Sequence, residues 1–237
     1  TLPDEPTTNA SQIDGASGTL QLESIDGFEV LHLDGSAVYG RDEAELGWLE
    51  SFERRLFAIS DGHFVVIDSF EVRSDRPESA VSEYWHSFHQ EAPPLPEDCV
   101  RQDQHVEQSS PGPGELLLLP VCSNLANTAA ESAGRIVADS LQPGAFVVDT
   151  PFSFINRLNQ TEWRSRSRYV PDAPVRSDLR VFLLSSATAS TELPTAGIEH
   201  GSCSAGTCFT VSVGSESWEL SFTESGGGWN LVGIAAP

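Results

Sequence analysis

The sequence predicts an all-β protein, specifically a large antiparallel β-sandwich with at most one short helix. Three observations support this fold class: short segments of alternating apolar and polar residues recur along the chain, turn residues separate them, and helical periodicity is nearly absent. Many strands without helical crossovers favour antiparallel pairing, and we expect two large sheets packed face to face.

The alternation begins with TLQLESI at residues 19–25 and continues with FEVLHLDG at residues 28–35. Asp26 and Gly27 separate the two segments and predict a tight hairpin turn. Further strands are predicted at 52–59, 63–72, 80–89, 115–121, 145–149, 161–170, 178–186, 207–213, 216–223 and 228–234.

One segment departs from this pattern, because residues 127–142 have helical composition. Gly134 and Pro143 limit any helix there to a short piece. The first residues are polar and lack periodicity, so we expect an arm or linker at 1–17 and a single β-sandwich domain at 18–237.

The composition is strongly acidic, with a formal net charge of -22, and all 13 basic residues are arginine. Such a surface repels phosphate backbones, so we expect no nucleic-acid partner. No apolar run has the length of a membrane span. The chain begins at Thr1 and contains no methionine, so we expect a processed product or an excised domain.

The chain contains four cysteines, an even number that suits an oxidising compartment. We expect two disulfides, one joining Cys203 to Cys208 across a hairpin tip and one joining Cys99 to Cys122. We therefore expect an extracellular or periplasmic, secreted protein.

Asp68 lies in an apolar run, HFVVIDSFEV, where a carboxylate must be paired, protonated or bound to a cation. If Asp61 and Gly62 form a two-residue turn, Arg55 lies opposite Asp68 and the two residues form a structural ion pair. The alternative is a metal or ligand role for Asp68. His86 and His89 are the other candidate ligands, of a structural zinc site that would draw on several strands.

Two groups of residues could act on a substrate. Tyr84 and His86 are candidates for proton transfer, because tyrosine and histidine are suited to general acid and base roles. In WRSRSRYV, the residues Arg164, Arg166 and Arg168 alternate, so a strand places them on one face as a binding stripe for carboxylates. The alternative role of this stripe is neutralisation of neighbouring acidic strands or of a partner subunit.

The run RRLFAISDGHFVVIDSFEV, followed by EYWHSFH, resembles the C-terminal β-sandwich of heparinase II/III-type polysaccharide lyases. The similarity covers about residues 50–90 and is carried by Arg55, Asp68, Trp85, His86 and His89. In this family, a helical toroid supplies most of the acid and base groups, and the sandwich completes the cleft and sometimes holds a structural zinc.

The resemblance implies an accessory or substrate-cleft β-sandwich that lacks its catalytic toroid, so we expect no complete enzyme from this chain alone. Its partner would be a polysaccharide, a separate helical domain or another protein subunit. Two alternatives remain open: a structural or interaction protein of an extracellular assembly, and a carbohydrate-binding module without catalysis.

Overall fold

The computed structural model describes residues 17–39, 47–88, 106–120, 132–148, 152–155, 161–188, 193–204, 206–225 and 228–236. Within these ranges the chain forms β-strands and no helix, and every strand pairing is antiparallel. The predicted all-β antiparallel fold is confirmed. Residues 1–16 of the expected polar arm lie outside the described residues.

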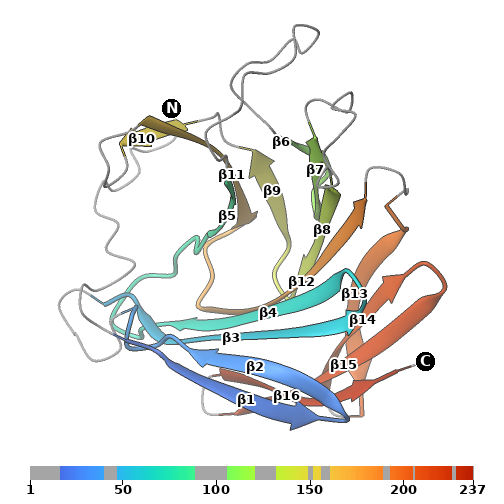
Figure 1. The fold of residues 1–237 in the computed structure, drawn as a ribbon. Helices are drawn as coiled ribbons and strands as arrows, with labels where there is room; N and C mark the ends of the chain where they lie inside the picture. Colours follow the sequence, from blue (N-terminus) through green and yellow to red (C-terminus); the bar gives the residue numbers. More distant parts are fainter. Residues whose placement is uncertain are drawn as a thin grey trace, which may run out of the picture.

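The largest sheet has eight strands and curves through the centre of the molecule (Figure 1). Its strands, in spatial order, are β1 (Thr19–Ile25), β2 (Phe28–Asp34), β3 (Leu49–Ser60), β4 (His63–Val72), β12 (Ser177–Thr188), β8 (Ser132–Ser140), β7 (Glu115–Pro120) and β6 (Val106–Gly112).

Two smaller sheets accompany it, so the described residues form three sheets where we expected two. The second sheet contains β10 (Phe152–Ile155), β11 (Thr161–Pro171), β5 (Glu83–Phe88) and β9 (Gly144–Val148). The third, C-terminal sheet contains β13 (Ala196–Cys203), β14 (Gly206–Val213), β15 (Glu216–Ser225) and β16 (Gly228–Ala235).

The central strands β4 and β12 are buried on both faces. On one face Val65 and Val181 belong to a core that they share with Phe209 and Leu220 of the C-terminal sheet. On the other face Val66 and Phe182 pack with residues of the second sheet, Phe146 and Tyr169 among them. Burial on both faces explains why β4 reads as an almost continuous apolar run and not as a clean alternation.

The first hairpin has the predicted turn. Asp26 and Gly27 both have positive φ, at 49° and 88°, as a type I′ turn requires. The Asp26 carboxylate also accepts a hydrogen bond of 2.9 Å from the backbone N–H of Ile234, which fastens the hairpin to the C-terminal sheet.

The predicted register of the β3–β4 hairpin is wrong by one residue. The turn begins as expected, with Ser60 opposite His63, but the ladder then skips Ile59 and pairs Ala58 with Phe64. This bulge places Arg54, and not Arg55, opposite Asp68. In addition, Gly62 has positive φ in this turn and Asp61 does not, so the turn is not type I′.

The helical composition of residues 127–142 gives no helix in the part that the structure describes, since Ser132–Ser140 forms strand β8. This strand lies between β12 and β7, and the side chains of Ile136 and Ala138 are buried against the second sheet. Tertiary pairing on both edges therefore overrides the helical composition.

The disulfide between Cys203 and Cys208 is confirmed and closes the β13–β14 hairpin. Cys99 and Cys122 lie outside the described residues. No helix long and apolar enough to cross a membrane occurs in the described ranges.

The packing of the second sheet on the large one predicts a strong dependence on Phe182. Its ring lies 5.1 Å from the Trp85 ring and 5.5 Å from the Tyr169 ring, with no solvent exposure. Phe182→Ala is expected to lower the free energy of unfolding by about 3 to 5 kcal/mol, measured by urea denaturation. Phe64→Ala is the matched control, because this ring is 44% exposed. Equal losses of unfolding free energy in the two variants would contradict the packing of Phe182 between the two sheets.

Candidate functional site

The candidate functional residues of β5 and β11 lie opposite one another. The register pairs Arg166 with His86 and Arg168 with Tyr84, while Arg164 lies opposite Phe88. The strand register therefore sets the backbone positions of both candidates for proton transfer beside those of the predicted arginine stripe.

These positions lie on the face of the second sheet that is turned away from the eight-stranded sheet. Trp85 and Tyr169 alternate with them along the two strands, and both pack on Phe182 of the large sheet. Alternate strand positions lie on opposite faces, so Tyr84, His86, Arg164, Arg166 and Arg168 share the other face, which we call the β5–β11 outer face. Arg168 is half-buried there, and Val147, opposite it on β9, is exposed.

Asp68 forms an ion pair, as one of the two sequence interpretations requires, but its partner is Arg54. The Arg54 guanidinium donates from Nε to Oδ1 at 2.6 Å and from Nη2 to Oδ2 at 2.5 Å. Arg55, the expected partner, instead forms an ion pair with Glu53 at 2.8 Å and donates to the carbonyl oxygen of Trp229 at 3.2 Å.

Of the proposed zinc ligands, the structure describes the side chain of Asp68 and the strand position of His86. Both carboxylate oxygens of Asp68 are occupied by Arg54. On β5, Glu83 contacts Arg180 on the side of the large sheet, and by strand alternation position 86 belongs to the opposite, outer face. His89 lies outside the described residues.

The described residues also include a group with ligating atoms within 4.8 Å of one another, formed by Cys203, Cys208 and Glu219. Its two sulfur atoms are bonded to each other, so they provide no thiolates for a metal ion. We therefore identify no zinc site among the described residues.

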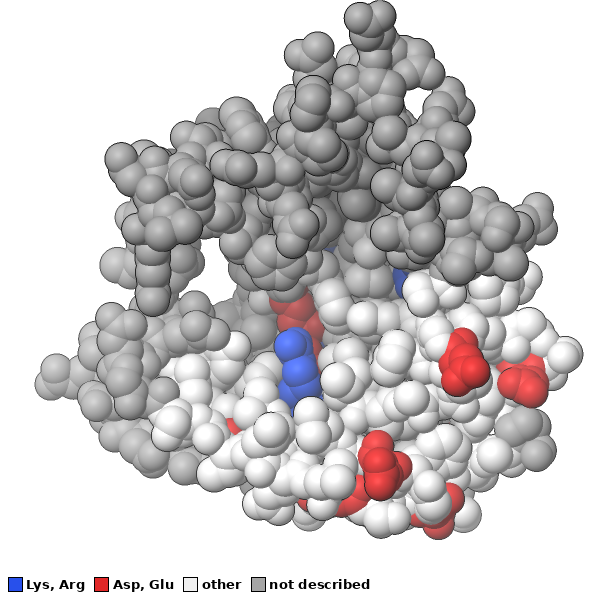
Figure 2. Space-filling view, in the orientation of Figure 1, with Lys and Arg blue, Asp and Glu red and all other residues white. Residues whose placement is uncertain are grey.

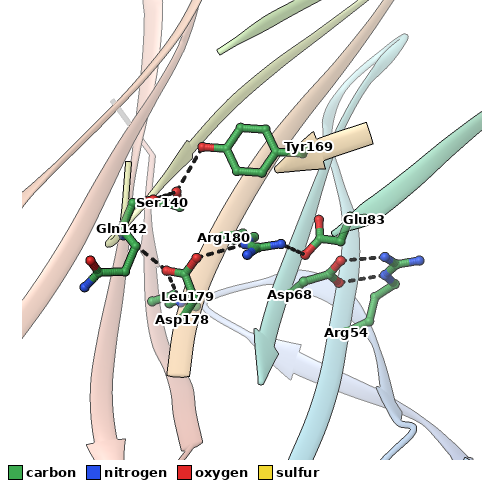
Figure 3. Close-up of polar contacts among 9 residues, drawn as sticks. All are labelled: Arg54, Asp68, Glu83, Ser140, Gln142, Tyr169, Asp178, Leu179 and Arg180. Atoms are coloured by element: carbon green, nitrogen blue, oxygen red, sulfur yellow. Dashed lines mark hydrogen bonds and ion pairs between the residues drawn. The ribbon is translucent and has the colours of Figure 1, made fainter. Parts of the chain in front are cut away.

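A cluster of five charged side chains, four of them buried and one, that of Arg54, 41% exposed, lies between the eight-stranded sheet and the second sheet (Figure 3). We call it the buried charge cluster, and its members are Arg54, Asp68, Glu83, Asp178 and Arg180. The Arg180 side chain has no solvent exposure and lies between two acids: Nη1 is 3.2 Å from Glu83 Oε1, and Nε is 2.8 Å from Asp178 Oδ2.

Aromatic rings complete the surroundings of Arg180. Its guanidinium carbon lies 4.8 Å from the centre of the Phe70 ring and 5.6 Å from the centre of the Tyr169 ring. Cation–π attraction is strengthened where water is excluded, so these rings help to offset the cost of burying the charge.

The remaining acceptor capacity of Asp178 is used by the backbone. Its Oδ1 accepts hydrogen bonds from the N–H groups of Leu179, at 2.9 Å, and Gln142, at 3.2 Å. Nearby, the Tyr169 hydroxyl contacts the Ser140 hydroxyl at 2.9 Å. Because the Ser140 hydroxyl also donates to the carbonyl oxygen of Gln142, these hydrogen bonds connect Asp178 of β12 to Ser140 of β8 and Tyr169 of β11.

The charges of the cluster balance when Glu83 is protonated. Two guanidinium groups, of Arg54 and Arg180, then face two carboxylates, of Asp68 and Asp178. Burial, reinforced by the negative charge of Asp68, raises the pKa of Glu83 to about 8, although Arg180 and Arg54 oppose the shift. Burial also raises the pKa of Asp178, against the opposing effect of Arg180.

The sequence interpretation missed four of the five cluster members, Arg54, Glu83, Asp178 and Arg180. A signal was available for two of them, because Asp178 and Arg180 alternate at the start of the apolar segment DLRVFLL, just as Asp68 interrupts its own apolar run. Glu83 carried no such signal, since it stands at the start of the aromatic segment EYWHSF and does not interrupt an apolar run, and its partner Arg180 is 97 residues away.

The Arg54–Asp68 pair predicts a large stability loss when the cation is removed. Arg54→Met leaves the fully buried Asp68 carboxylate without its partner, and we expect the free energy of unfolding to fall by about 3 to 5 kcal/mol. Asp75→Asn, which removes the exposed acid of the Arg73–Asp75 ion pair, should leave stability nearly unchanged. Urea denaturation of both variants measures the difference. An unchanged free energy of unfolding in Arg54→Met would contradict a stabilising role of the Arg54–Asp68 ion pair.

The raised pKa of Glu83 predicts a specific pH dependence. The folded state holds the Glu83 proton at pH values where the unfolded state has lost it, so this group's contribution to stability is full below about pH 4.5 and is lost as the pH rises through about 8. Glu83→Gln keeps the side chain neutral at every pH.

The stability of Glu83→Gln relative to the unsubstituted protein should therefore rise between pH 5 and pH 9, measured by urea denaturation at several pH values. Because the other titrating groups are common to both proteins, the difference isolates Glu83. A difference that stays constant over this range would show that Glu83 is ionised in the folded protein.

Comparisons with known proteins support the fold and add a family likeness. No protein-family model matches the sequence, and no curated protein matches it significantly. A solved heparinase III structure aligns with 86% of this chain at a TM-score of 0.53 and 11% sequence identity. A heparan sulfate lyase mutant from Pedobacter heparinus aligns with 87% of this chain at a TM-score of 0.53 and 12% identity.

In each case the chain spans about a quarter of the lyase, 27% of its length. The resemblance to heparinase-type lyases that residues 50–90 indicated thus extends, in fold, over most of the chain. The protein has the β-sandwich fold of a part of the heparinase III and heparan sulfate lyase structures.

Proposed function

We propose that this chain is the β-sandwich part of a heparinase III-like polysaccharide lyase, in which it forms one wall of the substrate cleft. The fold likeness to a 27% portion of heparinase III and heparan sulfate lyase structures supports this assignment. The observation that carries it within the chain is the register that places Arg164, Arg166 and Arg168 on the same outer face as Tyr84 and His86.

The chemistry of this face fits an acidic polysaccharide. Guanidinium groups form charge-assisted hydrogen bonds with carboxylate and sulfate oxygens. The rest of the chain is acidic, and on the face shown in Figure 2 acidic side chains are spread over the described surface while basic ones show at fewer places. Since a polyanion is repelled by such a surface, an arginine stripe gives it a defined place to bind.

Tyr84 and His86 are the members of this face that can exchange a proton. In β-elimination a base removes the proton at C5 of the uronate, the electron pair forms the C4–C5 double bond, and the C4–O bond breaks as the leaving oxygen takes a proton. We assign Tyr84 and His86 to a supporting role in these transfers, with the remaining groups supplied by a helical domain outside this chain.

The buried charge cluster has a positioning role in this proposal. It joins β5, which carries Tyr84 and His86, to β12 and β4 of the large sheet through Glu83 and Arg180. A rigid support of this kind reduces the cost of ordering the outer face on binding. An extracellular or periplasmic location belongs to the same proposal, supported by the Cys203–Cys208 disulfide.

Binding of heparan sulfate tests the proposed substrate face. Replacing Arg168 by Gln removes one cation and should cost about 1 kcal/mol of binding free energy, or about a fivefold loss of affinity, measured by isothermal titration calorimetry. The triple variant R164Q/R166Q/R168Q should lose binding almost entirely. Arg73→Gln is the matched control, since it makes the same charge change outside β11.

Two results would contradict the proposal. Unsubstituted protein that fails to bind heparan sulfate or any other uronate polysaccharide would favour a structural or interaction protein. Cleavage by the isolated chain, followed as absorbance of the unsaturated product, would show that no helical domain is needed. Binding without cleavage, lost in the triple variant and kept in Arg73→Gln, is the result that we expect.

A further inference from the structure

The C-terminal sheet carries a hairpin tip at which two sulfur atoms and a carboxylate lie together. β13 and β14 form this hairpin, with Gly201 opposite Cys208 and Cys203 opposite Gly206. The next strand, β15, contributes Glu219, and the ligating atoms of Cys203, Cys208 and Glu219 lie within 4.8 Å of one another. The two sulfurs form the disulfide that closes the hairpin, so this group can bind a metal ion only after the S–S bond is reduced.

The hairpin does not depend on the disulfide for its geometry. The four residues SAGT separate the two cysteines, and so short a loop restricts the unfolded chain less than a long one does. On its other edge β14 pairs with β15 from Thr207 to Val213, and the inner side chains of Phe209 and Val211 have no solvent exposure. These contacts should keep both cysteine positions side by side when the S–S bond is broken.

The disulfide is open to a reductant at Cys203, which is partly exposed, whereas Cys208 is 5% exposed. A low-molecular-weight thiol, as its thiolate, attacks the Cys203 sulfur, and the S–S bond breaks as the Cys208 sulfur takes the electron pair and leaves as a thiolate. A second thiolate then attacks the sulfur of the bound reductant and releases Cys203. The protein gains two thiols, and the two reductant molecules leave joined by a disulfide.

We propose that Cys203, Cys208 and Glu219 form a metal site in the reduced chain, where zinc or another thiolate-binding divalent cation replaces the disulfide as the cross-link of the hairpin tip. Zinc is held by cysteine sulfurs at about 2.3 Å and by carboxylate oxygens at about 2.0 to 2.2 Å, with ligand spacings of the type C-x2–4-C. The C-x4-C spacing of the two cysteines lies within this range. This inference does not depend on the proposed polysaccharide function.

The surroundings of the three residues favour a bound cation. The hydroxyl oxygen of Ser221 lies 3.4 Å from the Cys208 sulfur, so it can donate a hydrogen bond to a thiolate there. Glu199 and Glu219 lie on either side of Thr210, opposite it on β13 and β15, so strand alternation places a second exposed acid on the same face. Thiolate ligands select zinc or cadmium over magnesium and calcium, which take oxygen ligands.

Titration of the reduced full chain with Co²⁺ tests the proposal, because cobalt can replace zinc and its thiolate complexes absorb through sulfur-to-cobalt charge transfer. Cys99 and Cys122 are replaced by Ser in every protein of the series, so that only Cys203 and Cys208 can supply thiolates. After reduction with dithiothreitol and its removal under nitrogen, the charge-transfer band should appear, and added Zn²⁺ should abolish it. Added Ca²⁺ should leave the band in place, and the oxidised protein should show none.

The role of the carboxylate is tested with a matched pair of variants. Glu219→Gln should weaken Co²⁺ binding at least about tenfold. Glu216→Gln is the control and should bind nearly as the parent does, because it makes the same charge change on the same strand but outside the group. Equal weakening in the two variants would show general attraction to an acidic surface and overturn the site. A reduced protein without the band, or one that loses its β-structure by circular dichroism, would also overturn it.

Discussion

The placement of Arg180 is the constraint on which the rest of the structure depends. Its guanidinium has no solvent exposure, and a buried cation of this kind is tolerated only with carboxylates and ring faces around it. Asp178 comes from its own strand, whereas Glu83 comes from β5 of the second sheet. Bringing both acids to Arg180 therefore requires both layers to be assembled, and Asp68 and Arg54 extend the same cluster to β4 and β3.

This constraint links the core to the candidate function. The inner positions of β5 and β11 carry Glu83, Trp85 and Tyr169, which contact the large sheet. The alternation of the strands then leaves the positions of Tyr84, His86 and the three arginines on the outer face. The contacts of the inner positions thus fix which positions of β5 and β11 form the outer face.

The sequence predicted the features that depend on residues close together in the chain. Alternation identified most strand segments but not β6, β8, β10 and β13, and the Asp26–Gly27 turn and the Cys203–Cys208 pairing followed from short spacings. The prediction from sequence failed for features that depend on contacts between distant residues. The bulge at Ile59 shifts Asp68 from Arg55 to Arg54, and a one-residue shift of this kind leaves no trace in an apolar pattern. Residues 132–140 form a strand because β12 and β7 pair with it. Glu83 meets Arg180 across 97 residues of sequence, beyond the reach of any periodicity.

Native-state hydrogen exchange in Arg180→Met tests the central claim most directly, namely that the buried charge cluster holds the second sheet on the large one. The account predicts that amides of β5 and β11 exchange through a much easier local opening in this variant, while amides of β14 and β15 keep protection close to the global limit. Unchanged protection in β5 and β11, or an equal loss in all three sheets, would contradict it.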